Sequence, residues 1–422
     1  MANFLLFTET AAGHVAPALP ISSALVEHGH QVTWITGRVF KDRVEATGAI
    51  YIPTPEELDP GELAGHDIFP ELRKLKGAAQ LKWYYKHVYL DHVIDHLEAI
   101  DSALERFPSD VLIGDSVMLG VYFKSELSNL PSAMISIGPL GVPSRDVPPF
   151  GLALLPGKGP IIRARDRILN WISDKVILGD LNTYSNKIRR QLGLASKASF
   201  VRALFEAPTL VLQPSTPAFE YPRSDLPKNL HFIGPILPKC DPAFSPPDWW
   251  TDLRSERPVI LINQGTIAKN PNDLIFPAIE GLRDQNMLVV AVPVDDQGLD
   301  NLPQNVRAEK FIPFAHLLPF VTVMVTNGGY GSVHMALAHG VPLVVAGATE
   351  DKMEVAARVE WSGAGINLRT QYPSPEKIRE AAREVLSNPT YRENAQRIQR
   401  DFSCYHAPEK AAELLGALAE RA

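Results

Sequence analysis

Cysteines, long apolar runs and clusters of basic residues are all scarce in this sequence of 422 residues. The two cysteines, Cys240 and Cys404, stand too far apart in the chain for a zinc motif or a disulfide framework. No apolar run approaches the roughly 20 residues that a membrane-spanning helix needs. The 41 lysines and arginines are scattered and are outnumbered by 48 acidic residues. These absences exclude a disulfide scaffold, predict no stable membrane insertion, and argue against nucleic acid as a partner.

What the sequence does contain is typical of an ordinary globular protein. Hydrophobic residues make up 45% and charged residues 21%, and the net charge is -7. The length predicts two large domains or three small ones. The opening residues, Met1 to Glu9, have no basic leader and too short an apolar run for a secretion signal, so we expect a cytoplasmic protein.

Short runs rich in Val, Ile and Leu alternate with longer amphipathic stretches, which is typical of parallel strands joined by helices. The sequence therefore predicts an α/β fold. In the first half we expect strands at Asn3 to Thr8, Gln31 to Ile35, Ala49 to Ile52, Asp110 to Ile113 and Ser132 to Ile135. In the second half we expect them at Thr209 to Gln213, His231 to Ile233, Val259 to Asn263, Met287 to Val292, Val306 to Phe311, Val321 to Thr326 and Pro342 to Ala346.

A proline-dense segment, Pro235 to Pro247, separates the two halves and can continue neither sheet. We place the cut near residue 240, with one domain over 1–235 and the other over 236–401. Each half contains a strand, a tight loop and a helix start. Two doubly wound, Rossmann-like domains would face each other across a crevice, which is where such folds bind ligands.

His14 follows the first predicted strand and precedes a helix that we expect to start at Pro17 and to end at Gly29. Because the positive end of a helix dipole disfavours an imidazolium, we expect the ring to stay neutral near pH 7 and to accept a proton. Asp115 ends another strand at the same sheet edge, where its carboxylate would fix the His14 tautomer. The alternatives are a histidine that caps the turn and an aspartate that caps the next helix.

Three loops after strands in the second half suit a nucleotide sugar. Asn327 to Ser332 leads into a helix, and Gly329 and Gly331 let backbone N–H groups approach a diphosphate, with Ser332 as a further donor. Gln264, Gly265 and Thr266 would contact the same phosphates. Glu350 and Asp351 would accept hydrogen bonds from sugar hydroxyls, the alternative being a solvated charged loop. The donor-binding residues predicted in these loops are Gly265, Thr266, Asn327, Gly329, Gly331, Ser332, Glu350, Asp351 and Lys352.

These motifs together resemble the nucleotide-sugar-dependent glycosyltransferases of family 1, nearest to the bacterial macrolide and natural-product branch. Gly13-His14-Val15, Gly265-Thr266 and the ordered motifs between residues 311 and 367 carry the resemblance. It implies a GT-B fold, an inverting mechanism without a metal, and a C-terminal helix that returns to the first domain, which residues 402–422 would supply.

The resemblance also implies roles for single residues. His14 would be the general base and Asp115 its partner, Phe311 and Ile312 would bind the nucleobase, Ser332 would contact phosphate, and Asp351 would contact sugar hydroxyls. We expect Trp83, Tyr84 and Phe150 to contact the acceptor. The chain departs from the family pattern at three positions: Asn327 replaces a phosphate-binding histidine, Met335 a ribose-binding glutamate, and Lys352 the glutamine after Asp351.

Two further patterns are open to other interpretations. His92 and His96 stand four residues apart among other histidines and aspartates, like a metal pair, but a third ligand is missing, so we expect a solvated or acceptor-facing helix and no metal. The segment from Ile161 to Val176 alternates apolar residues with arginines. Such a helix can lie on a membrane surface, but we favour a helix that covers the acceptor cavity.

The sequence thus predicts transfer of a hexose, glucose by preference, from a UDP- or TDP-sugar to a hydroxyl of an apolar small molecule. No cofactor is expected beyond the nucleotide sugar itself, which is a co-substrate, and the protein would be a monomer or a homodimer. The alternatives are an epimerase or hydrolase of nucleotide sugars with the same fold, and a sugar-nucleotide-binding protein without catalysis.

Overall fold

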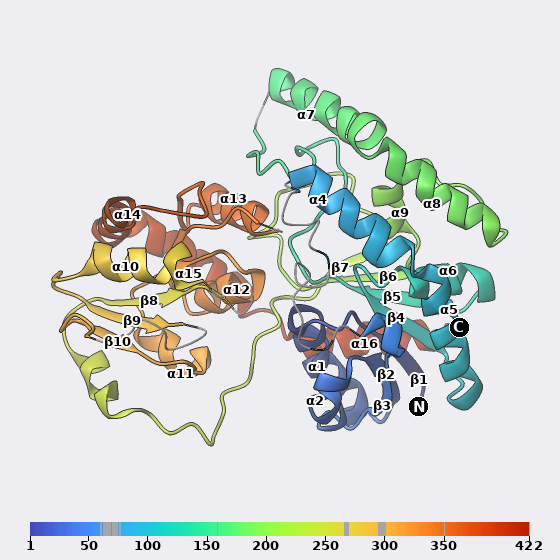
Figure 1. Ribbon diagram of the computed structural model, residues 1–422, viewed down its shortest axis with the longest axis horizontal. Coiled ribbons are helices and arrows are strands. Elements are labelled where there is room, and N and C mark those ends of the chain that lie inside the picture. Colours follow the sequence, from blue (N-terminus) through green and yellow to red (C-terminus); the bar gives the residue numbers. More distant parts are fainter. Residues whose placement is uncertain are drawn as a thin grey trace.

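Two parallel sheets, each covered by helices, form the two lobes of the computed structural model (Figure 1). The structure describes residues 1–59, 61, 69, 75, 77–157, 159–265, 270–293, 301–349 and 351–421. The sheet of the first lobe has the order β3-β2-β1-β4-β5-β6-β7 and that of the second lobe the order β10-β9-β8-β11-β12-β13. The predicted α/β class with two doubly wound sheets is confirmed.

The strands of the first lobe are β1 (Asn3–Phe7), β2 (Gln31–Thr36), β3 (Ile50–Pro53), β4 (Val111–Asp115), β5 (Ser132–Ile135), β6 (Leu210–Gln213) and β7 (Leu230–Phe232). Those of the second lobe are β8 (Val259–Asn263), β9 (Leu288–Val292), β10 (Val306–Ala308), β11 (Val323–Thr326), β12 (Leu343–Val345) and β13 (Gly365–Asn367). The predicted strand that was to reach Phe311 ends at Ala308, and the short β13 was not predicted.

The α-helices of the first lobe are α1 (Ala12–Glu27), α2 (Lys41–Glu45), α4 (Gly77–Tyr84), α5 (Val93–Arg106), α6 (Leu119–Ser128), α7 (Pro160–Ile172), α8 (Gly179–Gln191) and α9 (Phe200–Glu206). Those that follow are α10 (Ile275–Leu282), α11 (Phe314–Leu317), α12 (Tyr330–Ala338), α13 (Lys352–Ser362), α14 (Pro375–Ser387), α15 (Pro389–Phe402) and α16 (Ala407–Ala419). Two π-helical turns, Tyr85–Leu90 and Ser173–Ile177, continue α4 and α7. Among the helices described, none is long and apolar enough to cross a membrane.

Both faces of each sheet are buried, which explains why the strands are almost continuously apolar. In β1, Leu5 and Phe7 pack into one core cluster, and Phe4 and Leu6 pack into the cluster on the opposite face. The second cluster also contains residues of α1 and of α16, which crosses back from the second lobe to pack on α1 (Figure 1).

Candidate active site

The pairing of β1 with β4 brings His14 and Asp115 together. The two strands run in parallel with Phe7 opposite Gly114, so their carboxyl ends are neighbours. His14 stands in the first turn of α1, and its Nδ1 lies 3.0 Å from Oδ2 of Asp115. The helix begins at Ala12, because the N–H groups of His14 and Val15 already bond to the Ala11 carbonyl, so Pro17 does not mark its start as predicted.

The Asp115 carboxylate is buried and fully engaged. Its Oδ1 accepts hydrogen bonds from the backbone N–H groups of Val117 (2.8 Å) and Met118 (3.1 Å), and its Oδ2 accepts one from Glu9 N–H (2.8 Å). An ionised carboxylate can only accept, so Nδ1 of His14 must carry the shared proton. The other ring nitrogen, Nε2, is then the one that can accept a proton. The His14 side chain is 16% exposed and that of Asp115 is 1% exposed.

Neighbouring carboxylates act on the pKa of His14. Burial alone would lower the pKa of His14, but the Asp115 carboxylate in contact with it, together with Glu9 and Asp351, holds that pKa above its usual value. The sequence analysis considered only the helix dipole, which disfavours the imidazolium, and did not include these three carboxylates, which favour it. Burial would raise the pKa of Asp115, but His14 and the backbone N–H groups hold it below its usual range.

Glu9 is a residue of this site that the sequence analysis missed. It lies two residues after the end of β1, half-buried, and its backbone N–H donates to Asp115. Burial raises the pKa of the Glu9 carboxyl to about 7, against the lowering effect of His14. The rule that singled out Asp115, a carboxylate just beyond a central strand, applies equally to Glu9 and would have found it.

In the second lobe, the loops after β8, β11 and β12 meet at one sheet edge, because these three strands are neighbours. Asn263 links two of the loops: its Nδ2 donates to Ser332 Oγ (3.0 Å) and its Oδ1 accepts from Gly265 N–H (2.9 Å). Gly347 must be a glycine, since a Cβ there would lie 1.9 Å from the Asn327 carbonyl oxygen. Gly329 caps α12, so the N–H groups at the start of this helix have no acceptor within it and are available to an anion.

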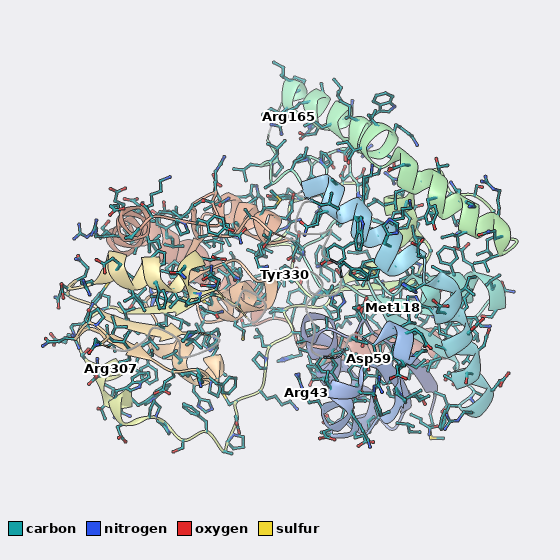
Figure 2. All side chains as sticks on the ribbon, in the orientation of Figure 1. Arg43, Asp59, Met118, Arg165, Arg307 and Tyr330 are labelled. Atoms are coloured by element: carbon teal, nitrogen blue, oxygen red, sulfur yellow. The ribbon has the colours of Figure 1, made fainter. Side chains whose placement is uncertain are left out.

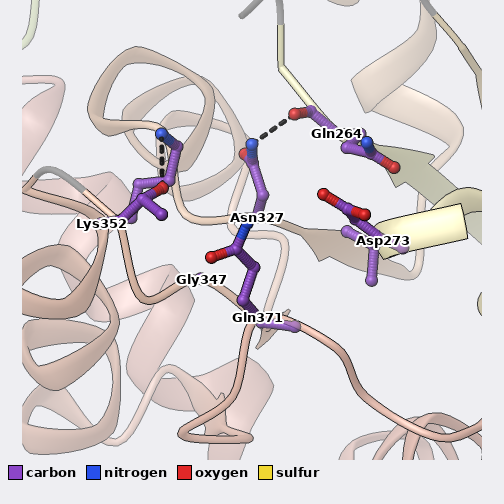
Figure 3. Close-up of a pocket in the computed structure, with 9 residues that line it drawn as sticks. Gln264, Asp273, Asn327, Gly347, Lys352 and Gln371 are labelled. Atoms are coloured by element: carbon purple, nitrogen blue, oxygen red, sulfur yellow. Dashed lines mark hydrogen bonds between the residues drawn. The ribbon is translucent and has the colours of Figure 1, made fainter. Parts of the chain in front are cut away.

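A pocket opens beside this helix end (Figure 3). Asn327 and Lys352 both line it, with Asp273 and Gln371 on its other side. Asn327 Nδ2 donates to the Gln264 carbonyl, and Lys352 Nζ donates to Thr349 Oγ1 (3.4 Å). Two of the departures from the family pattern, an amide for a histidine and a lysine for a glutamine, thus share one pocket.

The other donor-side residues have different surroundings. The Phe311 ring is 76% exposed, whereas the Ile312 side chain is buried in the core of the second lobe, which leaves only its backbone to contact a nucleobase. Asp351 precedes α13 and lies against the first lobe, since a Cβ at Gly138 would be 3.1 Å from its carboxylate. Met335 packs partly buried against the second-lobe core. Thr266 and Glu350 lie outside the described residues.

The predicted acceptor residues lie in two places. Trp83 and Tyr84 are half-buried at the end of α4, where the Trp83 ring contacts those of Tyr84 and His87. Phe150 is half-buried in a loop that the second lobe holds. Glu354 Oε1, from α13, accepts the N–H groups of Gly151 (2.7 Å) and Ala153 (2.9 Å). The loop that carries Phe150 is therefore tied to the helix that follows Asp351.

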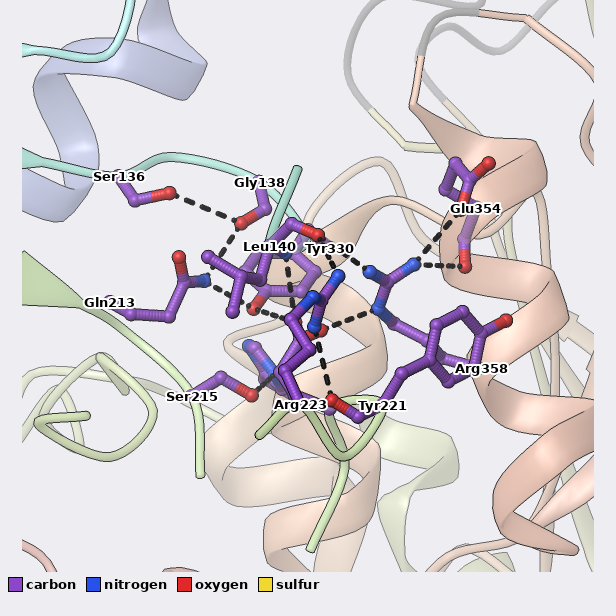
Figure 4. Close-up of polar contacts among 12 residues, drawn as sticks. Ser136, Gly138, Leu140, Gln213, Ser215, Tyr221, Arg223, Tyr330, Glu354 and Arg358 are labelled. Carbon is purple, nitrogen blue, oxygen red and sulfur yellow. Dashed lines mark hydrogen bonds and ion pairs between the residues drawn. The ribbon is translucent and has the colours of Figure 1, made fainter. Parts of the chain in front are cut away.

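A buried polar network joins the lobes (Figure 4). Arg358 of α13, 1% exposed, pairs with Glu220 of the first lobe at 2.7 Å and with Glu354 at 3.1 Å. Tyr330 OH donates to Glu220 (3.2 Å) and accepts from Gln213 (3.0 Å). Sequence reasoning missed this network, because partners such as Arg358 and Glu220 are 138 residues apart. Tyr330, at the start of α12 (labelled in Figure 2), thus serves the interface between lobes.

The histidines of α5 and its preceding turn are accounted for by local contacts. His87 pairs with Asp91, and His92 with Asp95, at 2.9 and 2.8 Å. His96 is buried against Gly120, and burial lowers its pKa to about 4. Within the part of the chain that the structure describes, no group of three or more His, Cys, Asp or Glu side chains could hold a metal ion.

Comparison with known proteins supports one family. The model of the erythromycin biosynthesis protein CIII-like C-terminal domain matches residues 281–418. The chain is 40% identical to 4'-demethylrebeccamycin synthase of Lentzea aerocolonigenes, covering 99% of both chains, and 33% identical to UDP-glycosyltransferase 2 of Phaeomoniella chlamydospora, covering 96% of this chain and 93% of that one.

Solved structures agree at the level of fold. A calicheamicin glycosyltransferase superposes with a TM-score of 0.74 at 23% identity, covering 100% of this chain and 99% of that one. A spinosyn rhamnosyltransferase complexed with thymidine diphosphate gives 0.70 at 20% identity, covering 98% and 100%. The chain is therefore a glycosyltransferase that uses a nucleotide sugar, and it belongs to family 1, in the natural-product branch.

Proposed function

We propose that this enzyme transfers glucose from a UDP- or TDP-sugar to a hydroxyl of an apolar small molecule, with inversion at the anomeric carbon and without a metal. The observation that carries the proposal is the His14–Asp115 pair on one lobe, close enough to Asp351 of the other lobe for that carboxylate to raise the pKa of His14. This proximity supports the proposal that a base and a sugar-binding carboxylate act together between the lobes.

The chemistry follows from the His14 tautomer. Nδ1–H stays bonded to Asp115, while Nε2 takes the proton of the acceptor hydroxyl. The acceptor oxygen forms a bond to the anomeric carbon from the face opposite the diphosphate. The bond from that carbon to the diphosphate oxygen breaks, and its electron pair leaves with the nucleotide. An α-linked donor then gives a β-linked product.

On the donor side, the start of α12 and the Ser332 hydroxyl are suited to the departing diphosphate. Ser332 Oγ already accepts a bond from Asn263, so its own O–H remains to donate. Lys352 adds positive charge to the pocket that Asn327 also lines, which supports the view that it supplies the charge missing from position 327. Phe311 exposes a ring on which a nucleobase can stack.

The proposal is tested with a matrix of UDP- and TDP-sugars against phenolic, polyketide and terpenoid alcohols, read by mass spectrometry. We expect a mass gain of one hexose on an apolar alcohol, a β-linkage by NMR coupling, and unchanged turnover with a chelator. Free sugar or a new epimer from the donor alone, with no acceptor product, would instead identify a hydrolase or an epimerase. Retention of the α-linkage would contradict inversion.

A further inference from the structure

Helix α7 and the π-helical turn after it lie at the outer edge of the first lobe, where they run along the top of Figure 1. Large apolar side chains project from them into solvent. Ile161 is 83% exposed, Ile168 59%, Trp171 62% and Val176 64%. Single exposed apolar residues are common on protein surfaces, but four along one helical rod form a continuous feature that needs an explanation.

The burial of α7 is inverted relative to that of an ordinary surface helix. Its buried residue is the charged Asp166, which pairs with Arg165 at 2.7 Å (Arg165 is labelled in Figure 2). Asn170 Nδ2 donates to the backbone carbonyls of Ser144 and Val147, at 3.1 and 2.9 Å. Polar bonds therefore help to anchor the helix to the protein, Ile162, Leu169 and Ile172 are half-buried, and several large apolar side chains are exposed. In water, the exposed apolar side chains lose the stabilisation that burial would give them. The arrangement therefore suits an apolar medium outside the protein.

The charges on the outer face indicate what that medium is. Arg163 and Arg167 are exposed on α7, and within the described residues neither forms a salt bridge, although Arg163 is near enough to Asp146 to help hold the pKa of that carboxyl below its usual value. The acidic residue of the helix, Asp166, is buried and neutralised by Arg165. The chain as a whole carries a net charge of -7, so this cationic face is a local exception. Exposed Arg, Trp and Ile side chains on one helix are the composition of an interfacial helix at an anionic lipid surface.

We propose that α7 and its π-helical extension dock the enzyme on an anionic phospholipid surface, with Ile161, Ile168 and Trp171 inserted between headgroups and Arg163 and Arg167 paired with lipid phosphates. A second copy of the chain is disfavoured as occupant, because a symmetric contact would place these arginines side by side. The sequence analysis favoured a helix that covers the acceptor cavity, and docking through the exposed face is compatible with that role. Docking does not depend on the proposed donor or acceptor.

The test is cosedimentation of the full chain with vesicles of phosphatidylcholine alone or mixed with phosphatidylglycerol. We expect binding to the mixed vesicles that weakens as salt is raised. The double variant Ile168→Ser/Trp171→Ser should bind at least tenfold less. Arg163→Gln/Arg167→Gln should bind about 30-fold less to anionic vesicles, since each arginine near such a surface contributes about a factor of five. Tyr372→Ser, which removes a 68% exposed ring elsewhere, is the matched control and should bind like the wild type.

Thermal melting of each variant separates loss of docking from loss of folding, and an unchanged melting temperature is expected because the substituted side chains are exposed. Absence of wild-type binding to the anionic vesicles, or equal binding by Ile168→Ser/Trp171→Ser, would overturn the proposal. Sedimentation velocity without lipid gives a second check. Self-association that disappears in the same double variant would show that the patch meets another copy of the chain instead.

Discussion

The two halves of the active site are built by different means. In the first lobe, the hydrogen-bonded pair of His14 and Asp115 is fixed by strand register and by three backbone N–H groups. In the second lobe, three loops support one another through bonds such as that from Asn263 to Ser332. The first arrangement depends on two side chains that cannot be replaced separately. In the second arrangement, several groups from the three loops share the proposed binding of the donor. A change at one position can therefore be offset by a change at another.

The sharpest test of this difference is removal of the base. His14→Ala should lower kcat by about 10²- to 10⁴-fold, because it removes the ring nitrogen, Nε2, that takes the acceptor proton. Donor affinity, which the second lobe determines, should stay within a factor of about two by calorimetric titration. Full turnover of His14→Ala with a hydroxyl acceptor would show that the base has been assigned to the wrong residue.

Replacement of Asp115 should cause a smaller loss of activity and should also change the pH dependence of the rate. Asp115→Asn should lower kcat/KM by about 10- to 100-fold, because the ring loses its orientation. His14 acts only when neutral, so the rate falls as the pH drops through its raised pKa. Removal of the Asp115 charge lowers that pKa, and the acid limb of the profile should move to lower pH.

Glu9→Gln is the matched comparison for the shift of the acid limb that is expected of Asp115→Asn. Glu9 also raises the pKa of His14, but it is not recorded in contact with the ring, and its own pKa of about 7 leaves it only partly charged near neutral pH. The acid limb should therefore move in the same direction but less far. An acid limb that stays in place in both variants would mean that it reports a group other than His14.

The two halves of the active site also differ in how much of each could be predicted from the sequence. The pairing of His14 with Asp115 was predictable, because carboxyl ends of parallel strands share one edge and both residues follow buried apolar runs. The pKa of His14 is raised mainly by Asp115, and the further contributions of Glu9 and Asp351 were not predictable, since these residues come from different loops and lobes. The early start of α1 was also missed, because Pro17 and Pro20 lie inside the helix rather than at its first turn.

In the second lobe, the glycine motif correctly located the start of α12. The residue types at single positions, however, did not indicate where their side chains lie. Ile312 matches the family motif, yet its side chain fills the core. Lys352 breaks the motif, yet it lines the same pocket as Asn327. The buried pairing of Arg358 with Glu220 could not be derived, since the two residues belong to separate lobes.

If Lys352 supplies the positive charge that is missing at Asn327, a histidine at position 327 should restore donor binding after Lys352 is replaced. Lys352→Gln should raise the donor KM about tenfold, through loss of a charge-assisted contact with the diphosphate. Adding Asn327→His to that variant should recover most of the loss, because it restores the family's own pair of residues at the two positions. Lys377→Gln, an exposed lysine on α14, controls for net charge. A double variant no better than Lys352→Gln would show that the two positions act independently.

The smallest expected effect lies where the halves are joined. Glu354→Ala removes the acceptor of the Gly151 and Ala153 N–H groups and frees the loop that carries Phe150. The acceptor KM should rise a few-fold, on the order of 0.5–1.5 kcal/mol, while the donor KM stays constant. Glu354→Gln keeps an oxygen for both N–H groups, so its acceptor KM should stay near the wild-type value. Because Arg358 retains Glu220 in both variants, an equal rise in donor KM would indicate that the interface as a whole, and not this loop, had been disturbed.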